Sequence, residues 1–178
     1  MAKVLLIVNG ALITACAVSV VSGCAATGKY PKRDPREVGD RVERLHQEML
    51  RALTAKPVSD SGTKARPCYE DWRKKKKVKM REDDPWKIDY DQFEFGVSVV
   101  VPVQEQAQAR SLYDALVRNL QAGAGWKAGE SHNTAGIVSG VEAGKQGVHL
   151  SAFDTPDGRG GRTVYANLQT DCYRHPDA

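Results

Sequence analysis

The sequence predicts an α+β fold, a two-layer sandwich in which two amphipathic helices pack on one antiparallel sheet of about four to six strands. Three observations support this class. Two segments repeat apolar residues at helical spacing, several shorter segments alternate apolar and polar residues, and turn-forming sequences separate the last of these. The helices need an apolar surface to cover, and an antiparallel sheet offers one such face.

The first helix is expected over residues 35–55. Asp34 can cap it, Pro35 suits the first helical position, and Glu37 stands three residues after the cap. Apolar side chains then recur at three- or four-residue steps: Val38, Val42, Leu45, Met49 and Leu53. His46 lies at the edge of this stripe. We expect it to be a surface residue, because no second metal ligand stands at a suitable spacing.

A basic run follows a loop. Residues 56–67 are rich in turn formers and are expected to be loop. In an extended conformation, alternate residues of the segment 73–81 share one face, and that face is basic throughout: Arg73, Lys75, Lys77, Lys79 and Arg81. Two interpretations stay open. The face either binds a polyanion, or is a solvated strand surface that lysines protect from edge pairing.

The basic run is expected to form a hairpin with the segment that follows it. The hairpin would turn through residues 82–85 and pair Met80 with Ile88 and Val78 with Tyr90. In this register lysines stand opposite aspartates, and each such cross-strand pair contributes about 0.2–1 kcal/mol.

The strongest strand is expected over residues 93–101, where every odd-numbered position is apolar. The preceding segment has its apolar residues at even positions, so we expect a bulge or break near Asp91-Gln92. The strand should end at Pro102. A second helix is expected over residues 104–121. One of its faces carries Ala109, Leu112, Leu116 and Leu120.

The remainder of the chain is expected to be a series of strands. Their ranges are 126–131, 136–142, 147–153 and 162–170, with hairpin turns at 143–146 and 154–158. In the last strand Val164, Ala166 and Leu168 alternate toward the core. Cys172 continues that phase, so we expect its side chain to point to the core face.

Residues 1–23 differ from everything after them. Lys3 is the only charged residue among them, an apolar stretch follows, and small residues gather at its end. This pattern is typical of a secretory signal segment. An uncleaved transmembrane anchor is the alternative, since residues 4–22 could just span a bilayer.

The end of this segment, Val21-Ser22-Gly23-Cys24, resembles the lipobox of bacterial lipoproteins. The resemblance implies that the Cys24 thiol carries diacylglycerol, with acyl chains such as palmitate, and that the signal peptide 1–23 is removed. Each buried CH₂ of such chains contributes about 0.8 kcal/mol to membrane binding. A tether over residues 24–34 and a single α+β domain over residues 35–178 would follow. The order of the elements is also similar to that of small exported actinomycete-type lipoproteins of unknown role, which implies no catalytic residues.

The resemblance makes the cysteine count informative. Cys16 would leave with the signal segment and Cys24 would take the lipid, so that Cys68 and Cys172 remain. In an oxidising compartment this pair is expected to form a disulfide, with two buried free thiols as the alternative. A metal role is not expected, because the chain has no CxxC and no histidine at ligand spacing from either cysteine.

No catalytic spacing is found in the sequence, and neither a cofactor nor a metal is expected. The histidines form no HxH or HExxH pattern, and no GxSxG surrounds a serine. Ser131-His132 and Asp154 could in principle meet, but a chance Ser-His pair is the simpler interpretation. Residues 82–84 are expected to be an acidic turn and residues 158–161 a hairpin turn. The net charge of +4 is too mild for a dedicated nucleic-acid binder.

The favoured function is a non-enzymatic binding or interaction module, anchored by lipid to the extracytoplasmic face of the cell membrane. Its basic residues would meet anionic lipid, an envelope polymer such as teichoic acid, or an acidic protein. An envelope hydrolase or a carrier of a small apolar ligand is the alternative. A pocket in which His132, His149, Asp154 or Glu142 converge would favour the hydrolase. A carrier would need a cavity, lined by Phe93, Phe95, Leu112 and Leu116.

Overall fold

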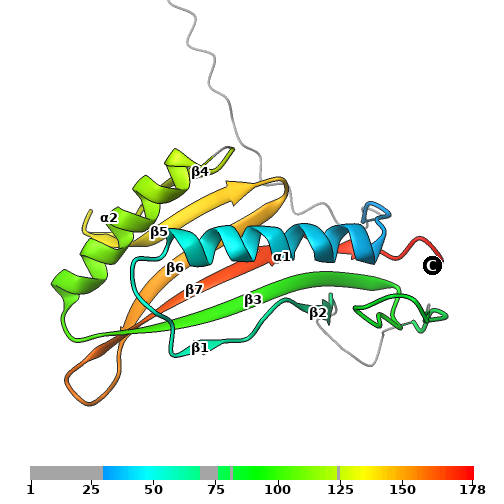
Figure 1. Cartoon of the computed structure of the whole chain (residues 1–178), viewed down its shortest axis with the longest axis horizontal. Coiled ribbons are helices and arrows are strands. Elements are labelled where there is room, and N and C mark those ends of the chain that lie inside the picture. Colours follow the sequence, from blue (N-terminus) through cyan, green and yellow to red (C-terminus); the bar gives the residue numbers. More distant parts are fainter. Residues whose placement is uncertain (1–29, 69–75, 81, 124) are drawn as a thin grey trace, which may run out of the picture.

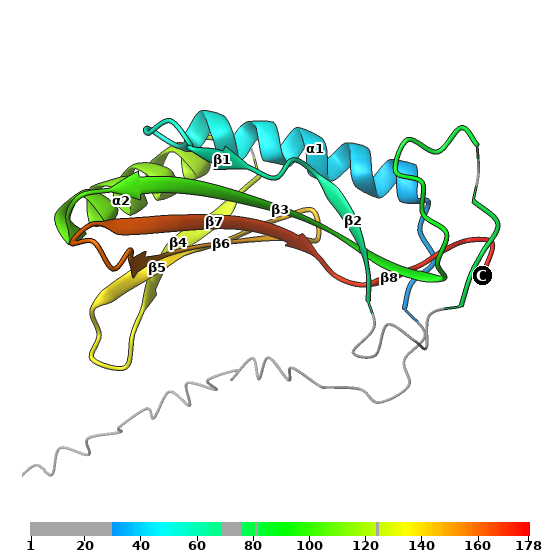
Figure 2. The ribbon, with the colours of Figure 1, turned by 90° about the horizontal axis from the view of Figure 1, so that it is seen from below.

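The computed structural model describes residues 30–68, 76–80, 82–123 and 125–178. Two helices lie on one face of an antiparallel sheet, so the predicted α+β class is confirmed (Figures 1 and 2). Within these residues the sheet has eight strands rather than four to six. The elements are α1 (Pro35–Ala52), β1 (Ser59–Asp60), β2 (Lys64–Pro67), β3 (Gln92–Val103), α2 (Gln106–Ala122), β4 (Lys127–His132), β5 (Val138–Lys145), β6 (Val148–Pro156), β7 (Arg162–Thr170) and β8 (Tyr173–Arg174).

The long strand β3 organises the sheet. The strand order is β1-β3-β7-β6-β5-β4, and β2 and β8 also pair with β3. After β3, helix α2 carries the chain to β4 at the far edge, and the consecutive hairpins of β4 to β7 return it to β3. Helix α1 packs on β3 and β7, helix α2 packs on β4 and β5, and the two helices contact each other. The chain thereby closes one core between two layers.

The strands β1, β2 and β8 were not predicted from the sequence. The expected loop 56–67 contains β1 and β2, which pair antiparallel with β3. Most of their side chains are exposed or half-exposed, so these strands show no apolar alternation. The prediction was wrong here because backbone hydrogen bonds to β3 hold these short edge strands, and such bonds leave no hydrophobic pattern in the sequence.

Helix α1 confirms its predicted cap and stripe. Asp34 Oδ1 accepts a hydrogen bond from Arg36 N at 2.9 Å, and the helix ends at Ala52, with Leu53 at its C-cap. The expectation that His46 lies at the surface was wrong, because its side chain is only 2% exposed. The segment containing β1 covers this edge of the helix and brings the Asp60 carboxylate to 3.1 Å from His46 Nε2. A polar loop folding back in this way has no signature in the periodicity of the helix.

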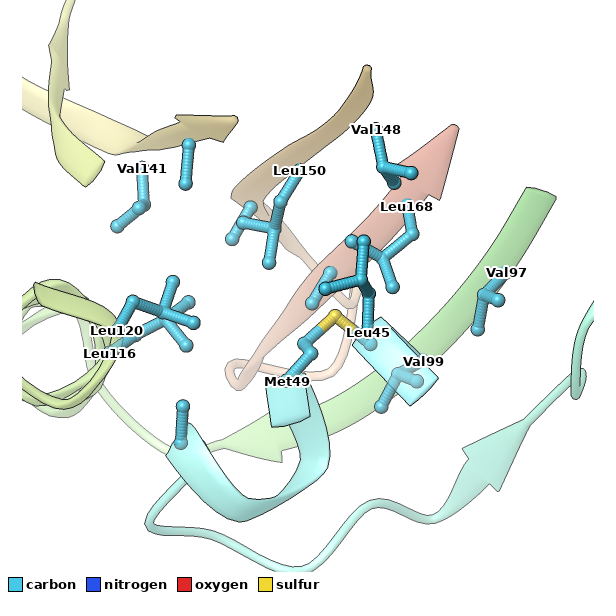
Figure 3. Packing of buried hydrophobic residues seen from close by; sticks show 14 of the residues in the cluster. Leu45, Met49, Val97, Val99, Leu116, Leu120, Val141, Val148, Leu150 and Leu168 are labelled. Carbon is cyan, nitrogen blue, oxygen red and sulfur yellow. The ribbon is translucent and has the colours of Figure 1, made fainter. Parts of the chain in front are cut away.

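The core lies between the helices and the sheet (Figure 3). All five odd-numbered apolar residues of the segment 93–101 are buried, as is the predicted stripe of α2. Leu45 and Met49 of α1 lie above β3 and β7, and Leu116 and Leu120 of α2 approach them from the side. The buried positions of β7 are those predicted to point inward: Val164, Ala166 and Leu168.

Strand β3 begins at Gln92, at the expected break, but it continues through Pro102 to Val103. Proline is tolerated at position 102 because no described strand pairs with β3 there, on the side to which its nitrogen points. Val100 O accepts a hydrogen bond from Val58 N on the β1 side of the strand. Pro102 lies two residues further on, so its nitrogen points to the same side, where pairing with β1 has already ended.

The predicted hairpin of the basic run is displaced by one residue. Lys77 rather than Val78 lies opposite Tyr90, and the pairing is an isolated bridge, not a strand. A slip of one residue reverses the faces of all side chains, and Met80 is accordingly 44% exposed. The register is set by the buried Asp91, whose Oδ1 accepts from Lys76 N at 3.1 Å, while its N–H donates to Lys76 O.

The expectation that Cys172 points to the core was also wrong. The inward alternation of β7 ends at Thr170, after which Tyr173 and His175 are the buried residues and Cys172 is half-buried. Residues 171 and 172 belong to no strand, and this break between β7 and β8 shifts the alternation by one position.

Candidate functional site

The structure joins the two predicted cysteines at one end of the sheet. Cys68 follows β2, Cys172 lies between β7 and β8, and their disulfide holds the two Cα atoms 5.9 Å apart. The predicted disulfide is therefore confirmed. Glu94 Oε2 lies 3.9 Å from Cys172 Sγ. Sulfurs joined to each other are not the thiolates that bind metals, so this arrangement is not a metal site.

The chain enters the domain at the same end. Residues 31–33 run beside β8, where Arg33 N donates to Arg174 O and Arg174 N donates to Pro31 O, each at 3.0 Å. Lys32 Nζ also donates to Pro176 O at 3.0 Å. Part of the expected tether is thus docked on the domain. Figure 2 shows the start of α1, the end of β2, β8 and the C-terminus gathered at this end.

Part of the predicted basic face lies at this end too. Lys77 and Lys79 are exposed, in the segment that pairs with the residues just before β3. Asp91 connects this segment to the C-terminal residues, because its N–H donates to Lys76 O and its carbonyl oxygen accepts from His175 N at 2.8 Å. Cys24, Arg73, Lys75 and Arg81 lie outside the described residues. Further exposed cations stand at the entry of the chain: Lys32, Arg33 and Arg36. We call Lys77, Lys79 and these three cations the basic end.

The acidic and glycine-rich turns have structural roles. Asp84 is buried and its Oδ1 accepts from Trp86 N at 3.0 Å, which fixes the turn that the sequence predicted. Asp157 Oδ1 accepts from Arg159 N at 2.7 Å and from Gly161 N at 3.0 Å. The segment 158–161 is therefore a hairpin turn between β6 and β7, as predicted, although the turn begins after residue 156.

The groups that could have favoured a hydrolase do not come together. His132 Nε2 lies 3.6 Å from Glu130 on β4, and His149 Nε2 lies 3.6 Å from Asp171, with both side chains exposed. Asp154 instead contacts α2 and β7. Its Oδ1 accepts a 2.6 Å hydrogen bond from the Tyr113 hydroxyl, and its Oδ2 accepts from Arg162 Nε.

Asp154 acts as a structural link in this arrangement. Burial raises the pKa of Tyr113, and the hydrogen bond to Asp154 raises it further. A phenol with a raised pKa stays protonated and keeps donating its hydrogen bond. The three residues therefore tie helix α2 to strands β6 and β7 beneath it.

A polar cluster that the sequence did not predict lies between the helix ends and β5. Glu48 Oε2 accepts hydrogen bonds from Trp126 Nε1 and Lys145 Nζ, each at 2.7 Å. They border a surface pocket of about 300 Å³. Burial raises the pKa of Glu48, but the bonds from Lys145 and Trp126 outweigh it, so the pKa is lowered overall. The members stand 78 and 97 residues from Glu48, and no motif could have connected them.

The described pockets differ from the cavity that a carrier would need. Phe93 and Phe95 are fully buried, and their rings contact each other edge to face at 5.9 Å. Two open clefts flank the junction of β3 and α2, with volumes of about 660 and 390 Å³. Their walls include Pro102, Val103 and Gln108, and of the four residues expected for a carrier only Leu112 borders one of them.

Comparison with known proteins finds no family model, no curated protein and no solved structure that matches this chain. Neither α1 nor α2, the helices of the described part of the chain, is long and apolar enough to cross a membrane. The sequence and the geometry of the domain are therefore the basis for a functional proposal.

Proposed function

We propose that this chain is a lipid-anchored, non-enzymatic binding module on the extracytoplasmic face of the cell membrane, attached through Cys24. The observation that carries the proposal is where the chain enters the domain. Residues 31–33 run along β8 at the basic end, so a lipid on Cys24 would hold that end toward the bilayer. The lipobox resemblance supplies the chemistry of attachment, and the docked segment supplies the orientation.

Few residues separate Cys24 from the docked segment 31–33. Cys24 and Pro31 are seven residues apart in sequence. Seven residues span at most about 25 Å when fully extended, and a flexible segment of this length averages about 13–16 Å. The Debye length at physiological ionic strength is about 8 Å. The average length exceeds the Debye length, but the shorter conformations of such a segment would bring the basic end within the negative potential of anionic headgroups.

Electrostatics would then favour one orientation of the domain. Each lysine or arginine near an anionic bilayer contributes about 1 kcal/mol. Lys77 and Lys79 would add this contribution to the anchor without replacing it. We take anionic lipid as the partner of the basic end, and an envelope polymer or an acidic protein are outcomes that the experiments below distinguish.

The anchor itself is tested by the substitution Cys24→Ala. We expect the wild-type chain to sediment with membranes and its mature N-terminus to be an acylated Cys24, because the lipid chains bury in the bilayer. Cys24→Ala should move the protein to the soluble fraction. Fractionation followed by mass spectrometry of the N-terminus measures both quantities. Cys16→Ala is the control, since it removes a thiol within the expected signal segment and should leave the protein on membranes. Membrane retention of a processed Cys24→Ala chain would refute the proposal.

The basic end is tested by reversing two of its charges. In the Cys24→Ala background, Lys77→Glu with Lys79→Glu should weaken binding to phosphatidylglycerol vesicles by about 10- to 30-fold, on about 1 kcal/mol for each residue. Neutral phosphatidylcholine vesicles should bind neither protein, as vesicle co-sedimentation would show.

The control for this experiment is Lys56→Glu with Arg159→Glu. It makes the same change of net charge at exposed positions beyond the C-terminus of α1 and in the turn between β6 and β7. Figure 1 shows these regions at the opposite end of the domain. Equal losses for the two double variants would mean that net charge rather than the basic end determines binding.

A further inference from the structure

The sheet has a second face, which no described helix covers. Both α1 and α2 pack on the other side, as Figures 1 and 2 show together. Alternate residues of β3, β5, β6 and β7 point to this face. They are exposed or half-exposed except for the glycines Gly96 and Gly140, which are buried. A solvated face is ordinary for an antiparallel sheet, so its side chains decide whether it has a further role.

Two aromatic rings stack against each other on this face. Phe153 of β6 lies opposite Tyr165 of β7, with ring centroids 5.7 Å apart and ring planes inclined by 25°. The same row continues to Val100 on β3 and to Gly140 on β5. Phe153 is 44% exposed. Because Gly140 has no side chain, the strand next to Phe153 places nothing directly beside its ring. We call Phe153 and Tyr165 the aromatic platform.

A row of hydrogen-bonding groups runs parallel to the aromatic platform. Across the same four strands the next row is Ser98, Asn167, Ser151 and Glu142. Within the described chain, the side chains of Asn167 and Ser151 have no hydrogen-bond partner. Alternate residues of a strand lie about 7 Å apart. A ring-shaped ligand stacked on Phe153 can therefore place its polar groups at Asn167 and Ser151.

This combination selects the chemistry of a ligand. Aromatic faces pack against flat apolar surfaces such as the C–H face of a sugar ring, while amide and hydroxyl groups exchange hydrogen bonds with its hydroxyls. Glu142 is the only formal charge in the two rows, so the face matches an uncharged ligand rather than a polyanion. In these two rows the apolar side chains are Val100, Tyr165 and Phe153. Three side chains form a smaller apolar area than the centre of a standard protein interface, which buries about 1,600 Å² in total.

We propose that the aromatic platform and the polar row beside it form a binding face for uncharged polysaccharide chains. The inference rests on the proposed function only for where the domain would meet such a polymer. In that setting the lipid would hold the basic end at the membrane, and the sheet face would remain accessible to glycan strands of the envelope. The module would then connect the membrane to a carbohydrate polymer without any chemical reaction.

The test is a titration of the purified full chain in detergent with uncharged β-linked hexasaccharides of glucose and of N-acetylglucosamine, followed by calorimetry. We expect at least one of them to bind. Phe153→Ala should weaken that binding about tenfold through lost stacking, and Asn167→Ala about three- to tenfold through a lost hydrogen bond. Phe153→Trp should retain binding and report it as a change in fluorescence. Met80→Ala is the matched control, because Met80 is also 44% exposed but lies beside the basic end.

Three outcomes would overturn the inference. The first is that neither sugar binds, and the second is that Phe153→Ala and Met80→Ala bind equally well. The third is that Phe153→Ala abolishes self-association in sedimentation while sugar binding stays absent, which would assign the face to a second copy of the chain. The titration needs no bilayer, so a negative result leaves the Cys24 anchor untouched, and failure of the anchor leaves the titration valid.

Discussion

Removing the Cys68–Cys172 disulfide is expected to lower the free energy of unfolding by about 2–5 kcal/mol. The bond joins residues 104 apart in sequence, so it restricts the unfolded chain strongly. In the folded state it joins the end of β2 to the segment between β7 and β8. Strand β2 has only four residues and β8 only two. Strands this short make few backbone hydrogen bonds to β3, so without the disulfide they would be held weakly. Chemical denaturation of the wild type and of Cys68→Ser with Cys172→Ser measures the difference.

The same experiment carries its own control. A reducing agent should destabilise the wild type and leave the double serine variant unchanged, because that variant has no bond at this position to reduce. Hydrogen exchange should rise first at β8 and at residues 31–33, which depend on this end of the sheet. A loss below about 1 kcal/mol would mean that the strand pairings suffice without the disulfide, contrary to the expectation from loop closure.

Phe95→Ala is expected to cost about 3–5 kcal/mol of folding stability. Phe95 is fully buried on the helix side of β3. Its ring meets Trp86 edge to face at 5.2 Å and Phe93 at 5.9 Å. Removing the ring leaves a cavity among rigid groups that cannot collapse easily, so the cavity adds to the lost burial. Urea denaturation followed by circular dichroism gives the change in free energy and in m-value.

Phe153→Ala is the matched control for this prediction. It makes the same chemical change in the same sheet, but on the face opposite the helices, where the ring is 44% exposed. We expect a cost of about 0.5–1.5 kcal/mol, from the lost stacking on Tyr165. Equal costs for the two variants would contradict the assignment of the two faces. A small cost also ensures that the sugar titration of Phe153→Ala is carried out on a folded protein.

The elements with a clear apolar period could be predicted from the sequence. The buried stripes of α1 and α2 and the alternation of β3 and β7 were correct in type and in the residues that they bury. The physical reason is that burial acts on each side chain according to its direction, so a continuous core leaves a period along the chain. The disulfide could be anticipated by counting cysteines, since the expected lipidation of Cys24 and loss of Cys16 with the expected signal segment would leave one pair.

The elements held by backbone contacts could not be predicted. Strands β1 and β2 were expected to be loop, and the pairing of Lys77 with Tyr90 differs from the expected register by one residue. Backbone hydrogen bonds are the same for every residue type, so they leave little trace in the sequence. The buried His46 was missed for a related reason, because a polar segment distant in sequence covers it.

The features of the candidate sites also differ in whether local sequence or long-range pairing determines them. The sequence alone provided the resemblance to a lipobox at Cys24, the basic character of the segment 73–81 and the class of the fold, since these depend on local residue types and spacing. Only the tertiary structure placed the entry of the chain beside Lys77 and Lys79. It alone also set Phe153 against Tyr165 across β6 and β7. Strand register and the meeting of chain ends depend on long-range pairing, which the whole fold determines and no single segment encodes.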